Sequence, residues 1–357
     1  MTKGKLVLAD GSVFAGDLFG YEGVARGEVV FTTAMTGYLE TLTDPSYAGQ
    51  IVTMTYPLMG NYGITRGDEE SDRAHVHAFL VREWSPTPSH YSAGPSLDAY
   101  LKEQRVVGLA GLDTRALVRR LRSVGTMVGV IVPAEMSDTQ AQALCTPEIT
   151  DWVGEVAIRE PYHLPGDGPH VVVMDFGMKR NILRNLQRLG LGITVVPRHT
   201  SAQEILALQP AGLMLTNGPG DPATQVQAIN TVRELAGKLP IAGICLGHQI
   251  IALAMGAKTY KLPFGHRGAN HPVKDLRTGR VCMTSQNHGY AVHEDSLKQT
   301  ELVVTHREIN DQTVEGVMHR HLPIWSVQYH PEGAPGPRDS SDLFDRVYAT
   351  FTGLVVS

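Results

Sequence analysis

One stretch of the chain constrains its fold more than any other: a short apolar run that turns into a helix at a cysteine. Residues 240–249 read Pro-Ile-Ala-Gly-Ile-Cys-Leu-Gly-His-Gln, and an apolar helical pattern follows that ends at Gly256. Because Gly243 and Gly247 lack Cβ atoms, a strand and a helix can approach closely around a tight turn at Cys245. The pattern predicts a nucleophile elbow that carries cysteine instead of serine, with the sulfur at a helix N-terminus that favours the thiolate.

A nucleophilic cysteine needs a base, and the base needs a group that orients it. Candidates for both follow the apolar strand pattern 324–329, where the sequence reads His330-Pro331-Glu332. In extended backbone, residues two apart point the same way, about 6.5–7 Å between their origins, and Pro331 favours extended geometry at His330. We therefore expect Glu332 to hold one ring nitrogen of His330 while the other faces Cys245. A lone cysteine is more often a small buried hydrophobe, so the prediction depends on all three residues.

Composition describes an ordinary globular protein and excludes several function classes. The 357 residues are 42% hydrophobic and 19% charged, with a net charge of −5 and no block of Lys or Arg. This argues against nucleic acid or an anionic membrane as a partner. No apolar run approaches the roughly 20 residues of a membrane span, and the N-terminus does not resemble a signal peptide. Three widely spaced cysteines suit a reducing cytoplasm, which is the expected location.

The first part of the chain is predicted to be a mixed, β-rich α/β domain. Asp10-Gly11 suits a tight hairpin turn between two strand patterns, and Ser96 and Asp113 precede helix patterns. The expected strands are 6–9, 12–16, 28–33, 50–56, 77–81 and 126–132, and the expected helices are 97–104 and 115–123. We find no nucleotide-binding loop and no catalytic constellation in this part.

The sequence rhythm changes after a segment rich in Pro and Gly, 161–169, which places the domain boundary between residues 168 and 169. From there strands alternate with helices: strands 171–176, 193–197, 212–216 and 241–244, with helices 179–189, 226–236 and 342–351, and further strands in the tail between 281 and 329. Ser201 and Glu204 predict a capping box for another helix. This alternation predicts a doubly wound parallel sheet in 169–357, with its site at the carboxyl ends of the strands.

Four motifs together resemble a known family. They are Gly243–Gln249, His330–Glu332, Thr216-Asn217-Gly218-Pro219-Gly220-Asp221-Pro222 and Ser285-Gln286-Asn287-His288-Gly289-Tyr290. With the N-terminal half, which carries Met35–Glu40 and Thr43–Gln50, they resemble the small, glutamine-hydrolysing subunit of carbamoyl-phosphate synthetase, a class I (triad) glutamine amidotransferase. The resemblance runs from about Leu6 to the C-terminus. It implies that residues 1–168 are the small-subunit N-terminal domain, which docks the large subunit, and that 169–357 are a flavodoxin-like amidotransferase domain.

The oxyanion of an amide hydrolysis needs fixed N–H donors. In an elbow one donor is the backbone N–H after the nucleophile, here that of Leu246. The second usually comes from a neighbouring strand-end loop, and Gly218-Pro219-Gly220 stands in the expected place, which predicts Gly220 as the donor. Asn-Gly and Pro-Gly are also common in ordinary turns. The loop lacks the Lys-Ser/Thr pair of a phosphate-binding loop, so it predicts no ATP site.

The family resemblance also implies the glutamine-binding residues. Those in the second domain are Gly218, Gly220, Leu246, Gln249, Asn287, Gly289 and Tyr290, the last at a position where the family often carries Phe. Gln249 lies one helical turn after Cys245, so it can face the same cleft. Ser46 matches a family serine that reaches glutamine from the first domain. From its own residues, Asp44-Pro45-Ser46 reads more simply as a turn with local hydrogen bonds.

Neither a cofactor nor a metal is predicted for this chain. His75-Val76-His77 would place two rings on one strand face, but no further ligand accompanies them. Since no nucleotide-binding unit is recognisable, the resemblance implies that ATP and Mg act on a separate large subunit, which receives ammonia through a tunnel and makes carbamoyl phosphate from bicarbonate. The expected assembly is a heterodimer with that subunit, and a higher oligomer of heterodimers stays open.

Three other functions fit parts of the pattern. The first is a stand-alone cysteine hydrolase of the same fold, and the second is a non-catalytic scaffold with a vestigial triad. The third is the amidotransferase component of another pathway, such as GMP or anthranilate synthesis, but those components resemble the second half only. Whether the product serves arginine or pyrimidine synthesis does not follow from the sequence.

Overall fold

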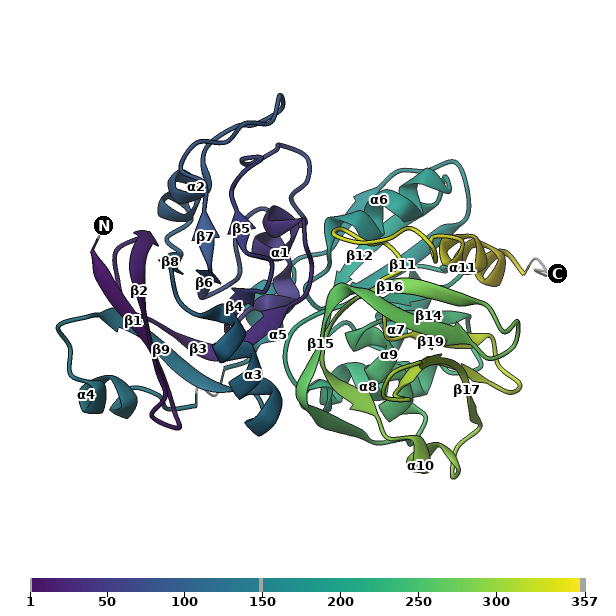
Figure 1. Cartoon of the computed structure of the whole chain (residues 1–357). Helices are drawn as coiled ribbons and strands as arrows, with labels where there is room; N and C mark the ends of the chain where they lie inside the picture. Colours follow the sequence, from purple (N-terminus) through teal and green to yellow (C-terminus); the bar gives the residue numbers. More distant parts are fainter. Residues whose placement is uncertain (1, 148–149, 354–357) are drawn as a thin grey trace. The chain divides into compact units, whose positions relative to one another are not determined.

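The computed structural model describes residues 2–147 and 150–353, and the chain divides into two compact units, Met1–Thr150 and Asp151–Ser357 (Figure 1). Each unit has its own hydrophobic core.

The first unit is built around a closed barrel of seven strands in the order β1-β2-β8-β6-β4-β3-β9. The strands are β1 Lys3–Leu8, β2 Val13–Gly20, β3 Ala25–Thr32, β4 Gln50–Met54, β6 Ala78–Val81, β8 Val107–Ala110 and β9 Met127–Pro133. The predicted strands are confirmed, the hairpin at Asp10-Gly11 among them. Their closure into a barrel was not predicted, because it depends on β9 pairing with both β1 and β3.

Helices and a small sheet complete this unit. The helices are α1 Tyr38–Thr43, η1 Pro45–Tyr47, α2 Leu97–Glu103, α3 Thr114–Val124 and α4 Asp138–Ala143, and β5 Leu58–Met59 pairs with β7 Glu83–Trp84. The side chain of Ser96 accepts from the Ala99 N–H, and that of Asp113 accepts from the Ala116 N–H. Both predicted helix starts are therefore confirmed.

The second unit contains a ten-stranded sheet whose first half is doubly wound. Four adjacent parallel pairs give the order β12-β11-β13-β14-β19, which is 2-1-3-4-5 in chain order, the flavodoxin-like arrangement. The strands are β11 His170–Asp175, β12 Gly192–Pro197, β13 Leu213–Leu215, β14 Ile241–Ile244 and β19 Ile324–Val327. The predicted α/β fold class is confirmed.

Helices cover both faces of this half-sheet (Figure 1). Alternate strand residues separate the two cores: Val171 and Val173 pack with α6 Arg180–Arg188 and α11 Leu343–Thr352, whereas Val172 and Met174 pack with the helices of the other face. Those helices are α7 Ala202–Ala207, α8 Val226–Leu235 and α9 Leu246–Ala254, with η2 Pro222–Thr224 before α8. The capping box of Ser201 and Glu204 is present at the start of α7, as predicted.

The second half of the sheet is antiparallel and follows in the order β18-β16-β15-β17. Its strands are β15 Thr259–Asp275, β16 Val281–Val292, β17 Leu302–Glu308 and β18 Val314–His319, and α10 Glu294–Leu297 lies between β16 and β17. The strand β15 was not predicted. Its pairing with β16 has two register shifts, and it contains Pro263, Gly265, Gly268 and Pro272, so it lacks the alternating pattern of a regular strand.

The segment before the predicted boundary belongs to the second unit. The helix α5 Trp152–Val156 contributes Val153 to a core of that unit, and β10 Tyr162–Leu164 pairs with β12 at the sheet edge. The compact unit therefore begins at Asp151, N-terminal of the predicted start at residue 169. Within the part of the chain that is described, no helix has the length and apolar character that crossing a membrane requires.

Candidate active site

Cys245 lies at the carboxyl end of β14, directly before α9, and its backbone is strained. It has φ 53° and ψ −105°, a region that residues with a side chain rarely adopt. Its N–H donates to the carbonyl of Val327 at 2.9 Å, and its own carbonyl accepts from the Gln249 N–H at 3.2 Å. The strand and the helix thus hold the cysteine at a sharp corner, the local geometry of a nucleophile elbow.

The glycines on either side allow this corner to form. A Cβ on Gly247 would lie 2.5 Å from the carbonyl oxygen of Leu215, and one on Gly243 would lie 2.8 Å from the carbonyl carbon of Gly247. Such contacts do not occur in real structures, so both positions require glycine. The N–H of Gly247 donates to the carbonyl of Thr216 at 2.9 Å, which ties the helix to the end of β13.

His330 and Glu332 lie together beyond the end of β19. Nδ1 of His330 lies 2.6 Å from Oε1 of Glu332, and both side chains are almost fully buried. The N–H of His330 donates to the carbonyl of Ser285 on β16 at 2.9 Å. A carboxylate only accepts, so Nδ1 carries a proton, and Nε2 has no hydrogen-bond partner within the described structure.

The site also contains a buried cation that was not predicted from the sequence. Nζ of Lys179 lies 3.1 Å from Oε1 of Glu332 and donates to the carbonyl of Gly333 at 2.5 Å. Nδ2 of Asn181 donates to the carbonyl of Glu332 at 2.5 Å. The start of α6 therefore holds the His330–Glu332 segment. The sequence offered one signal for this cation, a lysine after the first strand of a doubly wound sheet. Its partner Glu332 is distant along the chain, so the pairing could not be predicted.

The charges in this cluster shift one another. Burial lowers the pKa of His330, but the Glu332 carboxylate and the Cys245 side chain outweigh that effect, and the pKa is raised to about 10. Burial raises the pKa of Glu332, whereas the charges of Lys179 and His330 lower it, to about 2. Glu332 is thus an ionised carboxylate near neutral pH, and it favours the transfer of a proton from the Cys245 thiol to the His330 imidazole.

The Gly218-Pro219-Gly220 loop follows β13 and packs against the loop after β11. Oδ1 of Asn217 accepts from the Lys179 N–H at 3.0 Å. A Cβ on Gly218 would lie 2.2 Å from the carbonyl oxygen of Phe176, so this close approach requires glycine. Gly220 has φ +85° and open space where a Cβ would lie. Leu246 is the first residue of α9, where a backbone N–H has no partner within the helix.

The predicted glutamine residues of β16 lie next to the cysteine and to α9. The thiol of Cys245 donates to the carbonyl of Asn287 at 3.6 Å. Nε2 of Gln249 donates to the carbonyl of Tyr290 at 2.8 Å and to Oε1 of Gln328 at 2.9 Å. Gln249 therefore holds β16 in place. Gly289 lies between Asn287 and Tyr290 on the same strand, so its position is fixed as well.

Ser46 belongs to the first unit, in η1. Its N–H donates to Oδ1 of Asp44 at 2.9 Å, the local hydrogen bond that an ordinary turn predicts. A contact between Ser46 and glutamine stays a prediction.

Two family profiles match the chain. The profile described as "Carbamoyl-phosphate synthase small chain, CPSase domain" matches residues 6–131, and "Glutamine amidotransferase class-I" matches residues 172–350. Two solved structures are similar in part. A protein from Thermoplasma acidophilum, described as a putative subunit of GMP synthase, is 22% identical with a TM-score of 0.44, over 52% of this chain and 92% of that one. A glutamine amidotransferase from Thermotoga maritima is 14% identical with a TM-score of 0.36, over 46% and 76%.

Curated relatives match almost the whole chain. The carbamoyl phosphate synthase pyrimidine-specific small chain of Halalkalibacterium halodurans is 52% identical over 96% of both chains. The carbamoyl phosphate synthase small chains of Bacillus caldolyticus and Listeria monocytogenes are each 51% identical, over 97% and 99% of this chain and 96% and 98% of theirs. With an elbow cysteine in a class I glutamine amidotransferase domain and these relatives along nearly its full length, the chain belongs to the carbamoyl-phosphate synthase small-chain family.

Proposed function

We propose that this chain hydrolyses L-glutamine to glutamate and ammonia, with Cys245, His330 and Glu332 as its catalytic triad, and passes the ammonia to a large subunit. One observation carries the proposal: the strained elbow cysteine interacts electrostatically with an imidazole that a buried carboxylate orients at 2.6 Å. A cysteine with a merely structural role requires neither the strain nor the oriented partner.

The first half of the reaction forms a thioester. The His330 imidazole takes the proton of Cys245, and Sγ attacks the side-chain amide carbon of glutamine. The charge that develops on the carbonyl oxygen is stabilised by the N–H groups of Leu246 and Gly220. When the C–N bond breaks, the proton held by His330 passes to the departing nitrogen, so ammonia leaves as a neutral molecule.

The second half releases glutamate. His330 takes a proton from water, and the water oxygen attacks the thioester carbon. The C–S bond then breaks, and His330 gives that proton to Sγ, which restores the thiol of Cys245. Glu332 holds Nδ1 of His330 and stabilises the imidazolium in both steps. Asn287, Gly289, Tyr290 and Ser46 complete our assignment of the glutamine pocket, with Gly218 and Gln249.

The partner is inferred from the family and from the chemistry of ammonia. Ammonia is largely protonated at neutral pH and then cannot act as a nucleophile, so a protected path to an acceptor is required. The relatives are named as small chains, which supports a separate large subunit. We assign ATP, Mg and bicarbonate to that subunit, carbamoyl phosphate as its product, a tunnel as the path, and the cytoplasm as the location.

The test compares two nitrogen sources in the complex with the large subunit. Cys245→Ser should lower glutamine-dependent formation of carbamoyl phosphate by ~10³-fold or more, because a hydroxyl in this place is a poor nucleophile. Formation from added ammonium chloride should persist, since it does not need the triad.

The matched control is Cys282→Ser, a thiol of the same unit that donates to the carbonyl of Asp339. It should retain both activities. Glutamine use that survives Cys245→Ser would show that the triad assignment is wrong, and loss of both activities would show that the substitution acts on the complex and not on glutamine chemistry.

A further inference from the structure

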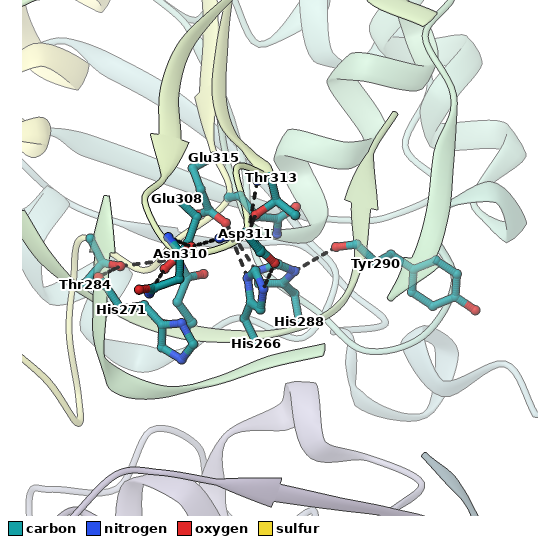
Figure 2. A network of polar contacts seen from close by, with 12 residues as sticks. His266, His271, Thr284, His288, Tyr290, Glu308, Asn310, Asp311, Thr313 and Glu315 are labelled. Carbon is teal, nitrogen blue, oxygen red and sulfur yellow. Dashed lines mark hydrogen bonds and ion pairs between the residues drawn. The ribbon is translucent and has the colours of Figure 1, made fainter. Parts of the chain in front are cut away.

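A second cluster of buried polar side chains contains none of the triad residues and lies where three strands of the antiparallel half-sheet meet. His266 on β15 and His288 on β16 are direct cross-strand partners, and Glu315 lies on β18 next to β16. Their side chains are 8%, 2% and 0% exposed. One nitrogen of each ring and one carboxylate oxygen point toward one another (Figure 2), and these three atoms lie within 4.8 Å of each other.

Each of the two rings has an acceptor beside its outer nitrogen. Nε2 of His266 lies 2.7 Å from Oδ2 of Asp311, and Nδ1 of His288 lies 2.7 Å from the carbonyl of Tyr290. Carboxylates and carbonyls only accept, so these outer nitrogens carry ring protons, and the inner nitrogen of each ring has a lone pair when the ring is neutral. Burial lowers the pKa of His266, but Asp311 and Glu315 outweigh that effect and raise it to about 9, so a metal ion would have to displace the second proton of this ring. Nδ1 of His266, Nε2 of His288 and Oε1 of Glu315 have no hydrogen-bond partner within the described structure.

No direct hydrogen bond joins the three facing atoms. Oε1 of Glu315 lies 3.7 Å from Nδ1 of His266 and 3.7 Å from Nε2 of His288. Hydrogen bonds between nitrogen and oxygen span about 2.7–3.2 Å, so neither gap is bridged directly. Around a tetrahedral ion with bonds of about 2.0–2.1 Å, ligand atoms are separated by about 3.3–3.4 Å. A contraction of a few tenths of an ångström would bring Oε1 of Glu315 to that spacing from each nitrogen, and the two nitrogens lie within 4.8 Å of each other.

We propose that His266, His288 and Glu315 bind a divalent transition-metal ion of the zinc class. Two imidazoles and one carboxylate are a ligand set that zinc uses in proteins, with a fourth position for water or a further group. The outer contacts fit this role, because metal-binding histidines donate their other N–H to a carboxylate or a carbonyl. The ion would also neutralise the buried charge of Glu315, whose other oxygen accepts from Nε2 of Gln286 at 2.8 Å.

The position suggests a structural ion that supports the glutamine pocket. The carbonyl of Tyr290 accepts from both His288 and Gln249, so one backbone group joins the metal ligands to the helix of the elbow. His288 itself stands between Asn287 and Gly289, which we assign to glutamine. An ion at this cluster would fix β16 in place without taking part in the chemistry.

The sequence did not predict this site, because its ligands come from three strands without a short spacing. The expectation that the chain binds no metal considered only His75 and His77 of the first unit. There Nε2 of His75 contacts Oγ of Ser71 and Nδ1 of His77 contacts the carbonyl of Arg26, so the two rings serve local contacts.

The experiment measures zinc binding by the full chain. Protein stripped with a chelator and titrated with Zn²⁺ in competition with a chromophoric chelator should bind one tight equivalent. Glu315→Gln and His266→Gln should each weaken it at least ~100-fold, since two ligands remain. Asp311→Asn, which changes an outer contact and no ligand atom, should weaken it ~10–100-fold.

The matched control is His271→Gln, whose ring lies 5.3 Å from that of His266 but outside the ligand group. It should bind zinc as the unaltered chain does. Equal affinity in Glu315→Gln and in the unaltered chain would overturn the proposal, and so would the absence of a tight equivalent, which would assign the cluster to ordered water.

A second measurement needs no variant and covers the case in which Glu315→Gln fails to fold. X-ray absorption of the chain loaded with one equivalent of zinc should show two imidazoles and only oxygen besides. A sulfur ligand, or no imidazole, would place the ion elsewhere and overturn the proposal. Neither result depends on glutamine hydrolysis, so the two proposals succeed or fail separately.

Discussion

Lys179 lowers the pKa of Glu332, one of the residues that we place in the triad. Its ammonium group is buried against Glu332, so the two charges compensate each other where water cannot. Removing one partner of a buried pair leaves the other charge without compensation, which typically costs about 3–5 kcal/mol. The geometry of His330 is held through Glu332, so Lys179 acts as a positioning residue.

Lys179→Met should therefore destabilise the second unit by several kcal/mol and lower kcat for glutamine more than it raises KM. Thermal unfolding and steady-state glutaminase kinetics are the measurements. Lys298→Met is the matched control, since that lysine is exposed and pairs with exposed Asp295. Equal behaviour of the two variants would contradict the role of Lys179.

The pKa shifts of Glu332 and His330 predict how the stability of the folded chain depends on pH. The pKa of Glu332 is about 2 in the folded chain, below its ordinary value of 4.5, so between these values the unfolded chain binds more protons and stability falls as pH decreases. The pKa of His330 is raised from 6.5 to about 10, so its contribution is complete below 6.5 and is lost as pH rises toward 10. In Lys179→Met the pKa of Glu332 moves back toward 4.5, and the acid limb should flatten. Denaturant unfolding between pH 3 and 10 measures both limbs, and an unchanged acid limb in the variant would contradict the assignment.

The sequence predicted those contacts of the site that join residues close to each other along the chain. His330 and Glu332 are two apart on extended backbone, and the structure brings them to 2.6 Å. Their proximity to Cys245 was inferred from chemistry and from the family, and it agrees with the interaction between the two side chains. Lys179, His266, His288 and Glu315 were missed, because contacts between distant strands leave no pattern in a single sequence.

Among the elements, the corner between β14 and α9 has the least tolerance for change. Gly247→Ala places a methyl group 2.5 Å from the carbonyl oxygen of Leu215, so the helix must shift away from β13. We expect a loss of about 1–3 kcal/mol in unfolding free energy and a larger loss in glutaminase activity, since Cys245 moves with the helix. Chemical denaturation and a glutaminase assay measure both effects.

The control for this corner is Gly192→Ala on β12. Its added Cβ meets nothing closer than 3.6 Å, and its backbone needs no positive φ. Activity should be retained there. If Gly247→Ala were as stable and as active as Gly192→Ala, the close approach of helix and strand would not be needed to hold the elbow.

Helix starts and parallel strands could be predicted because their signals are short in range. Ser96, Asp113 and Ser201 cap the helices that follow them, and the apolar runs of β11, β13 and β14 match strands buried on both faces. The strand β15 could not be predicted, since its prolines, glycines and register shifts hide the alternation on which strand prediction depends.

The first unit contains none of the residues that we place in the triad. We expect the full chain to form a stable 1:1 complex with a large subunit of the same enzyme, observed by size-exclusion chromatography with light scattering. Cys245→Ser should form the same complex, because the triad is not part of our docking assignment. If the two chains elute separately at micromolar concentration, the docking assignment fails.

The closure of the barrel could not be predicted from the sequence. It depends on the pairing of β1 with β9, and most of the first unit separates these two strands along the chain. It also restricts how any partner can recognise this unit. Every barrel strand already has two hydrogen-bonded neighbours, so a peptide of the partner cannot bind by adding a strand to the edge of this sheet. A partner that binds the barrel must therefore contact side chains and loops. Single substitutions there can change which partner is bound.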